Sequence, residues 1–230
     1  MYIKVNGIDL YYEEYGDENA PPVVFLHGNA GSMKTFQKTK EVFLKDKRVF
    51  LLDSRGHGKT VFEGKIDFPT MGADVAEFIT AKGLKDVSLV GYSDGGIVAL
   101  ETAAILGGVV KNMVVIGANL RFDGVKKAER AVLKAAYAFF SLFSFLKKYK
   151  QLKKCFYIML SQPEITEEKL KKITAKTLVA AGEHDIIEEK HTKEIAEKLP
   201  DSELLIVEGA DHFFFSKRND QINEIIKNFI

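Results

Sequence analysis

The fold of this chain is decided by residues 86–104, which read Asp86-Val87-Ser88-Leu89-Val90, then Gly91-Tyr92-Ser93-Asp94-Gly95-Gly96, then Ile97-Val98-Ala99-Leu100-Glu101-Thr102-Ala103-Ala104. The first group predicts a buried strand and the last a helix. The group between them has the pattern Gly-x-Ser-x-Gly, which is typical of a sharp turn from a strand into a helix. Such a turn forces the central serine into strained backbone angles and directs its hydroxyl outward.

The glycines around Ser93 follow from that geometry. A side chain at position 91 or 95 would collide with neighbouring backbone, and Gly96 lets the helix pack close to the sheet. The new helix also directs its N-terminal N–H groups and the positive end of its dipole at any anion that forms beside Ser93. The turn therefore presents a hydroxyl and stabilises negative charge in one place.

The composition is that of a single globular domain. The chain has 230 residues, 46% hydrophobic and 28% charged, and its formal net charge of +1 gives no reason to expect a nucleic-acid partner. The single cysteine, Cys155, excludes an internal disulfide, and residues 1–5 lack the apolar core of a signal peptide. These features predict a cytoplasmic protein and carry no signal for its oligomeric state.

Strands and helices are predicted to alternate along most of the chain. Residues 1–15 alternate apolar and polar side chains around Asn6-Gly7, the pattern of a hairpin with a two-residue turn. We also expect strands at 23–26, 48–52, 86–90, 113–116, 177–181 and 203–207, and helices at 32–45, 70–82, 97–104, 188–198 and from about 217. Strands separated by helices favour a mainly parallel sheet covered on both faces, so the predicted class is α/β.

Residues 120–175 interrupt this alternation with a helical composition and no convincing strand. We interpret them as a helical lid inserted in a core made of 1–119 and 176–230. Within 120–162 there are ten lysines and arginines but only two acidic residues. The uncharged run 135–146 contains four phenylalanines, and its twelve residues are too few to span a bilayer, which takes about 20.

Two interpretations of the run 135–146 remain open. In the favoured one, a helix packs on the body and roofs an apolar acyl pocket, with Phe139 and Phe143 as substrate contacts. In the other, the flanking lysines hold the aromatic face against an anionic membrane or interface.

Later in the chain, an aspartate and a histidine have the chemistry that a serine nucleophile requires. A serine hydroxyl is a weak nucleophile at neutral pH and needs a general base, which needs a group that fixes its tautomer and stabilises its cation. Asp185 follows the predicted strand 177–181, and His212 follows the strand 203–207. Since the carboxyl ends of parallel strands lie on one edge of a sheet, we expect Ser93, Asp185 and His212 to meet there.

The other histidines and nearby acidic residues are not expected to take part in catalysis. His27 belongs to a His-Gly turn beside the proposed oxyanion site, and Glu183 and Asp211 lie beside the site without a role. A surface position is expected for the other histidines, His57, His184 and His191. No His-Glu-x-x-His motif or cysteine pair occurs, so neither a metal nor another cofactor is expected.

A phosphate-binding loop is also not expected. Gly58-Lys59-Thr60 is similar to the end of such a loop, but position 53 is Asp where the loop requires Gly. The anion that forms when Ser93 attacks a carbonyl needs two preorganised donors. We assign the backbone N–H of Asp94, just after the nucleophile, and that of Asn29, just after His27-Gly28.

Five motifs together resemble the α/β-hydrolase superfamily over nearly the whole chain. They are His27-Gly28, Asp53-x-Arg55-Gly56-x-Gly58, the turn at Ser93, Gly182-x-x-Asp185 and Gly209-x-x-His212. The chain order Ser, Asp, His is the order of that architecture. The turn sequence followed by Gly117-Ala118-Asn119 looks like the biphenyl-hydrolase-like branch, which includes amino-acid-ester hydrolases. The chain departs from common relatives at Lys176, where proline usually precedes the next strand, and in its short lid.

The resemblance and the predicted triad imply a cofactor-free serine hydrolase that cleaves a carboxylic ester of a small molecule through an acyl-enzyme. Amides, thioesters and carbon-carbon bonds next to a ketone are reached by the same triad and remain open. Haloalkane dehalogenation is disfavoured because that sister group has Asp, not Ser, at the turn. The alternative from another class is a non-catalytic ligand-binding receptor on this fold.

The side chain of Asp94 has two interpretations. As a residue of the first helical turn, its carboxylate caps the helix, turns away or pairs with a cation. Alternatively it receives a cationic part of the substrate, such as the α-ammonium of an amino-acid ester, which the resemblance to the biphenyl-hydrolase-like branch also favours.

Overall fold

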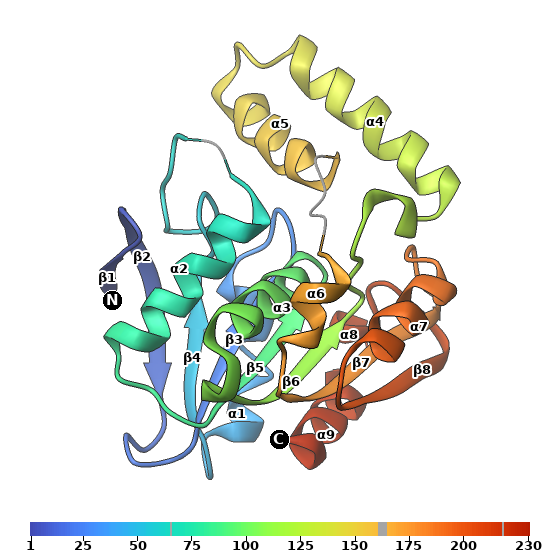
Figure 1. The fold of residues 1–230 in the computed structure, drawn as a ribbon. Helices are drawn as coiled ribbons and strands as arrows, with labels where there is room; N and C mark the ends of the chain where they lie inside the picture. Colours follow the sequence, from blue (N-terminus) through green and yellow to red (C-terminus); the bar gives the residue numbers. More distant parts are fainter. Residues whose placement is uncertain (65, 161–164, 218) are drawn as a thin grey trace.

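The computed structural model describes residues 1–64, 66–160, 165–217 and 219–230 (Figure 1). They form an eight-stranded sheet in the order β1-β2-β4-β3-β5-β6-β7-β8. β2 pairs antiparallel with β1 and β4, and the other neighbours pair in parallel, which confirms the predicted α/β class. The strands are β1 (Tyr2–Val5), β2 (Ile8–Tyr15), β3 (Pro22–Leu26), β4 (Arg48–Leu52), β5 (Val87–Tyr92), β6 (Val110–Ile116), β7 (Lys176–His184) and β8 (Ser202–Asp211).

The N-terminal hairpin predicted from the sequence is present. Asn6 and Gly7 have positive φ angles of 43° and 75°, as the two central residues of a type I′ turn require. The turn pairs Val5 with Ile8, and β2 then continues beside β4. The hairpin therefore extends the parallel part of the sheet by two antiparallel strands.

Helices cover both faces of the sheet, because the side chains of the central strands alternate between two cores. Val24 and Leu26 of β3 face the core formed with α2, α3 and α7, whereas Val23 and Phe25 face the core formed with α1, α8 and α9. Burial on both faces explains the continuous apolar run of β3. The helices are α1 (Lys40–Phe43), α2 (Phe68–Ala81), α3 (Asp94–Leu106), α4 (Lys127–Leu142), α5 (Lys147–Leu160), α6 (Glu167–Lys171), α7 (Glu189–Lys198), α8 (Phe214–Lys217) and α9 (Asn219–Phe229), with 3₁₀ helices η1 (Met33–Phe36), η2 (Gly107–Val109) and η3 (Phe122–Gly124).

One predicted helix is divided. The single helix expected at 32–45 is replaced by the short η1 and α1. The N–H of Met33 donates to the Asp53 carboxylate at 2.8 Å, so a side chain from beyond β4 holds the first turn in place. This anchor belongs to a distant part of the chain and leaves no local signal.

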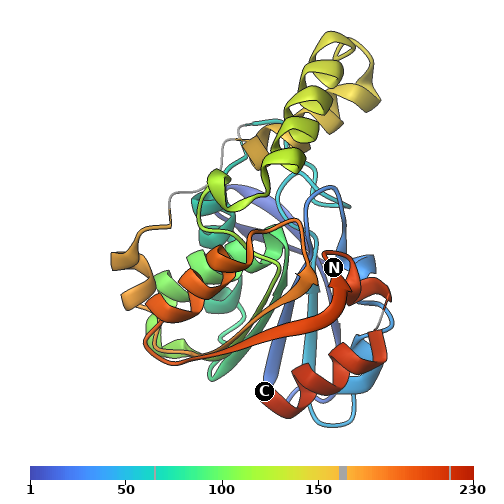
Figure 2. The same ribbon diagram turned by 90° about the vertical axis from the view of Figure 1, so that its right-hand side faces the viewer.

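Residues 120–175 form a helical hairpin, α4 and α5, followed by α6. The hairpin extends beyond the sheet (Figure 2), whereas α6 packs beside α3 and α7. None of the 16 residues of α4 is buried, and this helix packs on α5. Positions 161–164 of this segment lie outside the described residues, and its division from the core as a lid stays an interpretation.

Across the described part of the chain, no helix combines the length and the apolar character that crossing a membrane requires.

Candidate functional site

Ser93 sits in a strained turn between β5 and α3. Its φ of 55° and ψ of −122° are angles that a residue with a side chain rarely adopts. Its N–H donates to the carbonyl of Ile116 at 2.7 Å, and its own carbonyl accepts from the N–H of Gly96 at 2.8 Å. A Cβ at Gly95 would lie 1.9 Å from the carbonyl oxygen of Leu26, so only glycine fits beside the serine. The surrounding backbone therefore holds the strained angles in place.

The structure brings together the three residues that the sequence singled out at the strand ends. Nε2 of His212 lies 3.1 Å from Oγ of Ser93, and its Nδ1 lies 2.7 Å from Oδ1 of Asp185. Both His212 and Asp185 are buried. With its proton on Nδ1 and donated to the carboxylate, the imidazole directs the lone pair of Nε2 at the serine hydroxyl.

Backbone and side-chain contacts fix the positions of the acid and the base. The N–H of Ile187 donates to Oδ1 of Asp185 at 3.0 Å. The hydroxyl of Tyr92 donates to the carbonyl of His212 at 3.1 Å, and the two rings lie 5.6 Å apart. Burial, followed by the charges of Asp185 and Asp211, raises the pKa of Tyr92, so its hydroxyl stays protonated and remains a donor.

Tyr92 is a residue that sequence reasoning missed, because the variable position of the Gly-x-Ser-x-Gly pattern carries no recognisable signal. The two acidic residues beside the site that were given no catalytic role accept hydrogen bonds from nearby backbone groups. Glu183 accepts from the N–H of Gly209 at 2.8 Å, and Asp211 accepts from the N–H of Phe213 at 3.0 Å.

A cavity of about 430 Å³ opens beside Ser93 and His212. One side is the turn that follows β3, and the opposite side belongs to α5 and to the segments after β7 and β8. The lining residues are Gly28, Asn29, Ala30, Gly31, Thr35, Tyr92, Ser93, Phe156, Met159, Ile186, His212 and Phe213. The four large apolar residues of this wall were not predicted, although the spacing of Phe156 and Met159 places them on one face of a helix.

Phe139 and Phe143, the substrate contacts expected from the sequence, lie elsewhere. Their rings pack 4.9 Å apart, and each also packs on Tyr149 of α5. This cluster lies toward the end of α4 and the start of α5, whereas the cavity is lined from the second half of α5. The expectation was wrong because the hairpin, not the body, receives these two rings.

The two expected oxyanion donors belong to segments next to the nucleophile. A Cβ at Gly28 would lie 3.1 Å from Cβ of Ser93, so the turn leading to Asn29 runs directly beside the serine. Asp94 follows Ser93 in the chain. The side chain of Asn29 donates from Nδ2 to the carbonyl of Cys155 in α5 at 2.7 Å. This bond ties the turn to the hairpin.

The carboxyl group of Asp94 is buried, with 8% of the residue exposed. Burial raises its pKa to about 7, against the opposing effects of a hydrogen bond with Asn29 and the proximity of His212. Burial, and next the charge of Asp94, raises the pKa of the Cys155 thiol. A group with this pKa changes its charge in the neutral range, directly beside the proposed oxyanion site.

The surface position expected for His57 and His191 was wrong, because both are buried. Nδ1 of His57 lies 3.0 Å from the carbonyl of Arg55, in a loop that the Asp53 carboxylate folds inward by accepting from the N–H of Lys59 at 2.7 Å. Nε2 of His191 accepts from the N–H of Leu120 at 3.3 Å.

His184 is exposed, as expected. Nε2 of His27 accepts from the N–H of Ser54 at 3.1 Å, and its Nδ1 lies 2.8 Å from the carbonyl of Gly28. Burial lowers the pKa of His27 to about 4, so its neutral ring joins two loops at the site.

Comparisons with known proteins agree with the fold. A family model described as alpha/beta hydrolase fold matches residues 21–151. Serine hydrolase BPHL of Mus musculus is 26% identical over 257 residues, which cover 99% of this chain and 85% of that protein. Ethanol acetyltransferase 1 of Cyberlindnera jadinii is 33% identical over 107 residues, which cover 46% of this chain and only 32% of that protein. The solved structure of the esterase EaEST from Exiguobacterium antarcticum shares the fold, with a TM-score of 0.84 at 21% identity over 99% of this chain and 98% of that one.

Proposed function

This chain belongs to the alpha/beta hydrolase fold family, and from that premise we propose that it is a serine hydrolase that cleaves carboxylic esters of small molecules through an acyl-enzyme. The observation that carries the proposal is the pair of contacts at His212, 3.1 Å to Oγ of Ser93 and 2.7 Å to Oδ1 of Asp185. Nucleophile, base and orienting acid within hydrogen-bond reach of one another form the arrangement that acyl transfer requires.

In the acylation step, Oγ of Ser93 attacks the ester carbonyl carbon while its proton passes to Nε2 of His212. Asp185 stabilises the imidazolium, and the carbonyl oxygen becomes an alkoxide held by the backbone N–H groups of Asn29 and Asp94. The bond to the alkoxy group then breaks. The alcohol leaves with the proton from Nε2, and the acyl group remains on Ser93.

Deacylation repeats these events with water as the nucleophile. Water gives a proton to Nε2 of His212 and attacks the acyl carbon. The second tetrahedral intermediate expels Oγ of Ser93, which takes the proton back. One ester and one water become one carboxylic acid and one alcohol, and the enzyme returns to its starting state.

The cavity indicates the substrate class. Its volume of about 430 Å³ is within the usual range for small-molecule sites, about 300–1,000 Å³. Phe156, Met159 and Ile186 supply an apolar wall, which favours an apolar acyl or alcohol group over a sugar or a peptide.

A fluorophosphonate probe and a panel of p-nitrophenyl esters of increasing acyl length test the proposed function. We expect covalent labelling of Ser93, and turnover that falls once the acyl chain outgrows the cavity. Turnover of matched p-nitroanilides and thioesters shows whether the enzyme also cleaves amide and thioester bonds, which the same triad can reach. Labelling without turnover of any of these substrates would contradict the proposal and favour a ligand-binding receptor.

The charge of Asp94 leads to a prediction about substrate charge. Since its pKa is about 7, the wild-type side chain is neutral at lower pH, as in Asp94→Asn, and negative at higher pH. A negative charge opposes the oxyanion of a neutral ester. From about pH 6 to about pH 8, the ratio of kcat/KM for Asp94→Asn to that of the wild type should therefore rise about tenfold for a p-nitrophenyl ester.

For an aminoacyl ester, the same ratio should fall below one at the higher pH, because the wild-type carboxylate then attracts the substrate ammonium. Asp86→Asn is the matched control, since Asp86 is exposed at the opposite end of β5 and pairs with Lys111. If the ratio for Asp94→Asn is the same for both substrates at every pH, Asp94 supports only the turn.

A further inference from the structure

The helical hairpin exposes large apolar side chains at its distal end. The exposed fractions are 50% for Phe139, 72% for Leu142, 77% for Phe145 and 46% for Leu146. These four residues, here called the hairpin tip, lie at the end of α4 and in the connection to α5, and the hairpin extends away from the sheet (Figure 2). Apolar side chains gathered at one exposed end mark an interaction site, unlike exposed apolar residues scattered singly.

Aromatic packing inside the hairpin holds the tip in shape. Phe140 stacks on Tyr149 with ring centres 5.8 Å apart, and Phe143 packs 6.3 Å from Phe145. The first contact joins the end of α4 to the start of α5, and the second lies within the connection between them. The tip therefore presents its apolar side chains from a packed pair of helices and is already folded before it binds.

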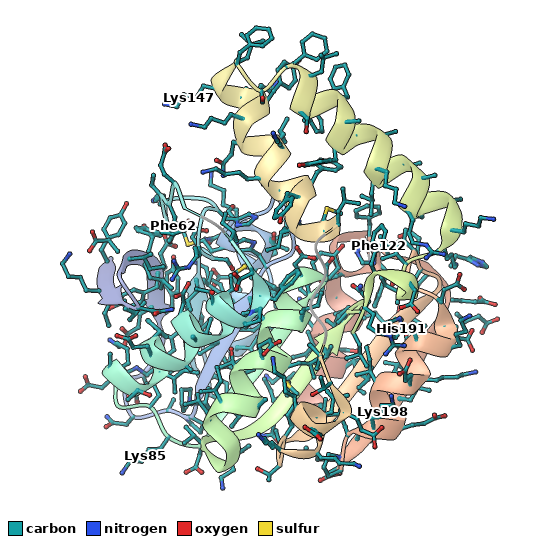
Figure 3. All side chains as sticks on the ribbon, turned by 45° about the horizontal axis from the view of Figure 1, so that its top comes forward. Phe62, Lys85, Phe122, Lys147, His191 and Lys198 are labelled. Carbon is teal, nitrogen blue, oxygen red and sulfur yellow. The ribbon has the colours of Figure 1, made fainter. Side chains whose placement is uncertain are left out.

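Positive charge surrounds the tip. Lys147, Lys148 and Lys150 follow it directly and are exposed, and Figure 3 shows Lys147 at the distal end of the hairpin. Residues 120–162 contain ten basic and two acidic residues, although the whole chain has a net charge of only +1. The hairpin segment thus concentrates the molecule's excess positive charge, and three of its exposed lysines lie at the start of α5, next to the apolar tip.

We propose that the hairpin tip docks this protein onto an anionic membrane surface, with the apolar side chains among the lipid headgroups and the lysines on the phosphates. This surface satisfies both properties of the tip, since it offers an apolar phase directly beneath negative charge. A second copy of the chain fits less well because the same positive surface would face itself. Docking goes beyond the proposed hydrolase activity and does not depend on it.

The hairpin also connects the docked surface with the cavity. α5 begins beside the tip and lines the cavity with Phe156 and Met159 in its second half. A membrane held at the tip would therefore lie at one end of a helix whose other end borders Ser93.

Co-sedimentation of the full chain with lipid vesicles tests the docking. We expect binding to phosphatidylcholine vesicles that contain phosphatidylglycerol and much weaker binding to phosphatidylcholine alone. Leu142→Ser combined with Phe145→Ser should lower the partition coefficient by about a hundredfold, because two large apolar side chains no longer enter the membrane. The control Ile105→Ser with Leu204→Ser removes two partly exposed apolar side chains from α3 and β8, away from the hairpin, and should bind as the wild type does.

A second pair of variants tests the contribution of the lysines to membrane binding. Lys147→Gln with Lys148→Gln should lower binding to the anionic vesicles by about tenfold or more and leave the weak binding to neutral vesicles unchanged. Lys45→Gln with Lys85→Gln is the matched control. Both lysines are exposed and lie just before β4 and β5, at the opposite edge of the sheet.

Several results would overturn the proposal: no co-sedimentation, equal binding to neutral and anionic vesicles, or wild-type binding by the Leu142 and Phe145 variant. If sedimentation velocity shows that the wild type is a dimer and this variant a monomer, the tip binds a second copy of the chain instead. Circular dichroism checks that each variant is folded, which we expect because all the replaced side chains are exposed.

Discussion

Replacement of Ser93 with alanine is expected to lower kcat for p-nitrophenyl esters by about 10⁶-fold. Alanine has no hydroxyl to form the acyl-enzyme, while the strained turn and the cavity remain. Steady-state kinetics with the best ester of the panel measure the loss. Ser88→Ala is the matched control, because it removes a buried hydroxyl from β5, the strand that leads into the turn, and should keep near wild-type turnover.

His212→Ala should reduce kcat to nearly the same extent, and the double variant should be no slower than Ser93→Ala. Nucleophile and base act as a unit across the 3.1 Å contact, so their losses do not add. His184→Ala, which removes an exposed histidine, should leave kcat unchanged. Near-normal ester hydrolysis by His212→Ala would show that the base is a different residue.

Asp185→Asn is expected to lower kcat by about 10⁴-fold. The carboxylate accepts a hydrogen bond from Nδ1 of His212 at 2.7 Å, whereas an asparagine that turns its amide nitrogen to Nδ1 donates to it. The imidazole then carries its proton on Nε2 and has no lone pair for the hydroxyl of Ser93.

The matched control for this variant is Asp211→Asn, one residue before His212. Asp211 accepts a hydrogen bond from the N–H of Phe213, which an asparagine oxygen can also accept. We expect kcat within a few-fold of the wild type, and thermal unfolding separates misfolding from lost catalysis in both variants. An equal loss in the two variants would contradict the role proposed for Asp185.

Local sequence patterns determined the sheet and the placement of the proposed catalytic residues. The apolar run of β3, the alternation around Asn6-Gly7 and the glycines beside Ser93 each depend on neighbouring residues, so they can be read from one stretch. The convergence of Ser93, Asp185 and His212 was also predictable. They follow different strands, and parallel strands bring their carboxyl ends to one edge of the sheet.

Only the tertiary structure decided what is buried around that edge. His57 is buried because Asp53 folds its loop inward, and Phe156 reaches the cavity because of the way α5 lies over the turn after β3. Phe139 and Phe143 have the same apolar character as Phe156 but pack within the hairpin. The apolar character of a side chain is a local property. The contacts that it makes depend on how α4 and α5 pair and on how α5 lies at the cavity, and no pattern within a single stretch of sequence specifies these arrangements.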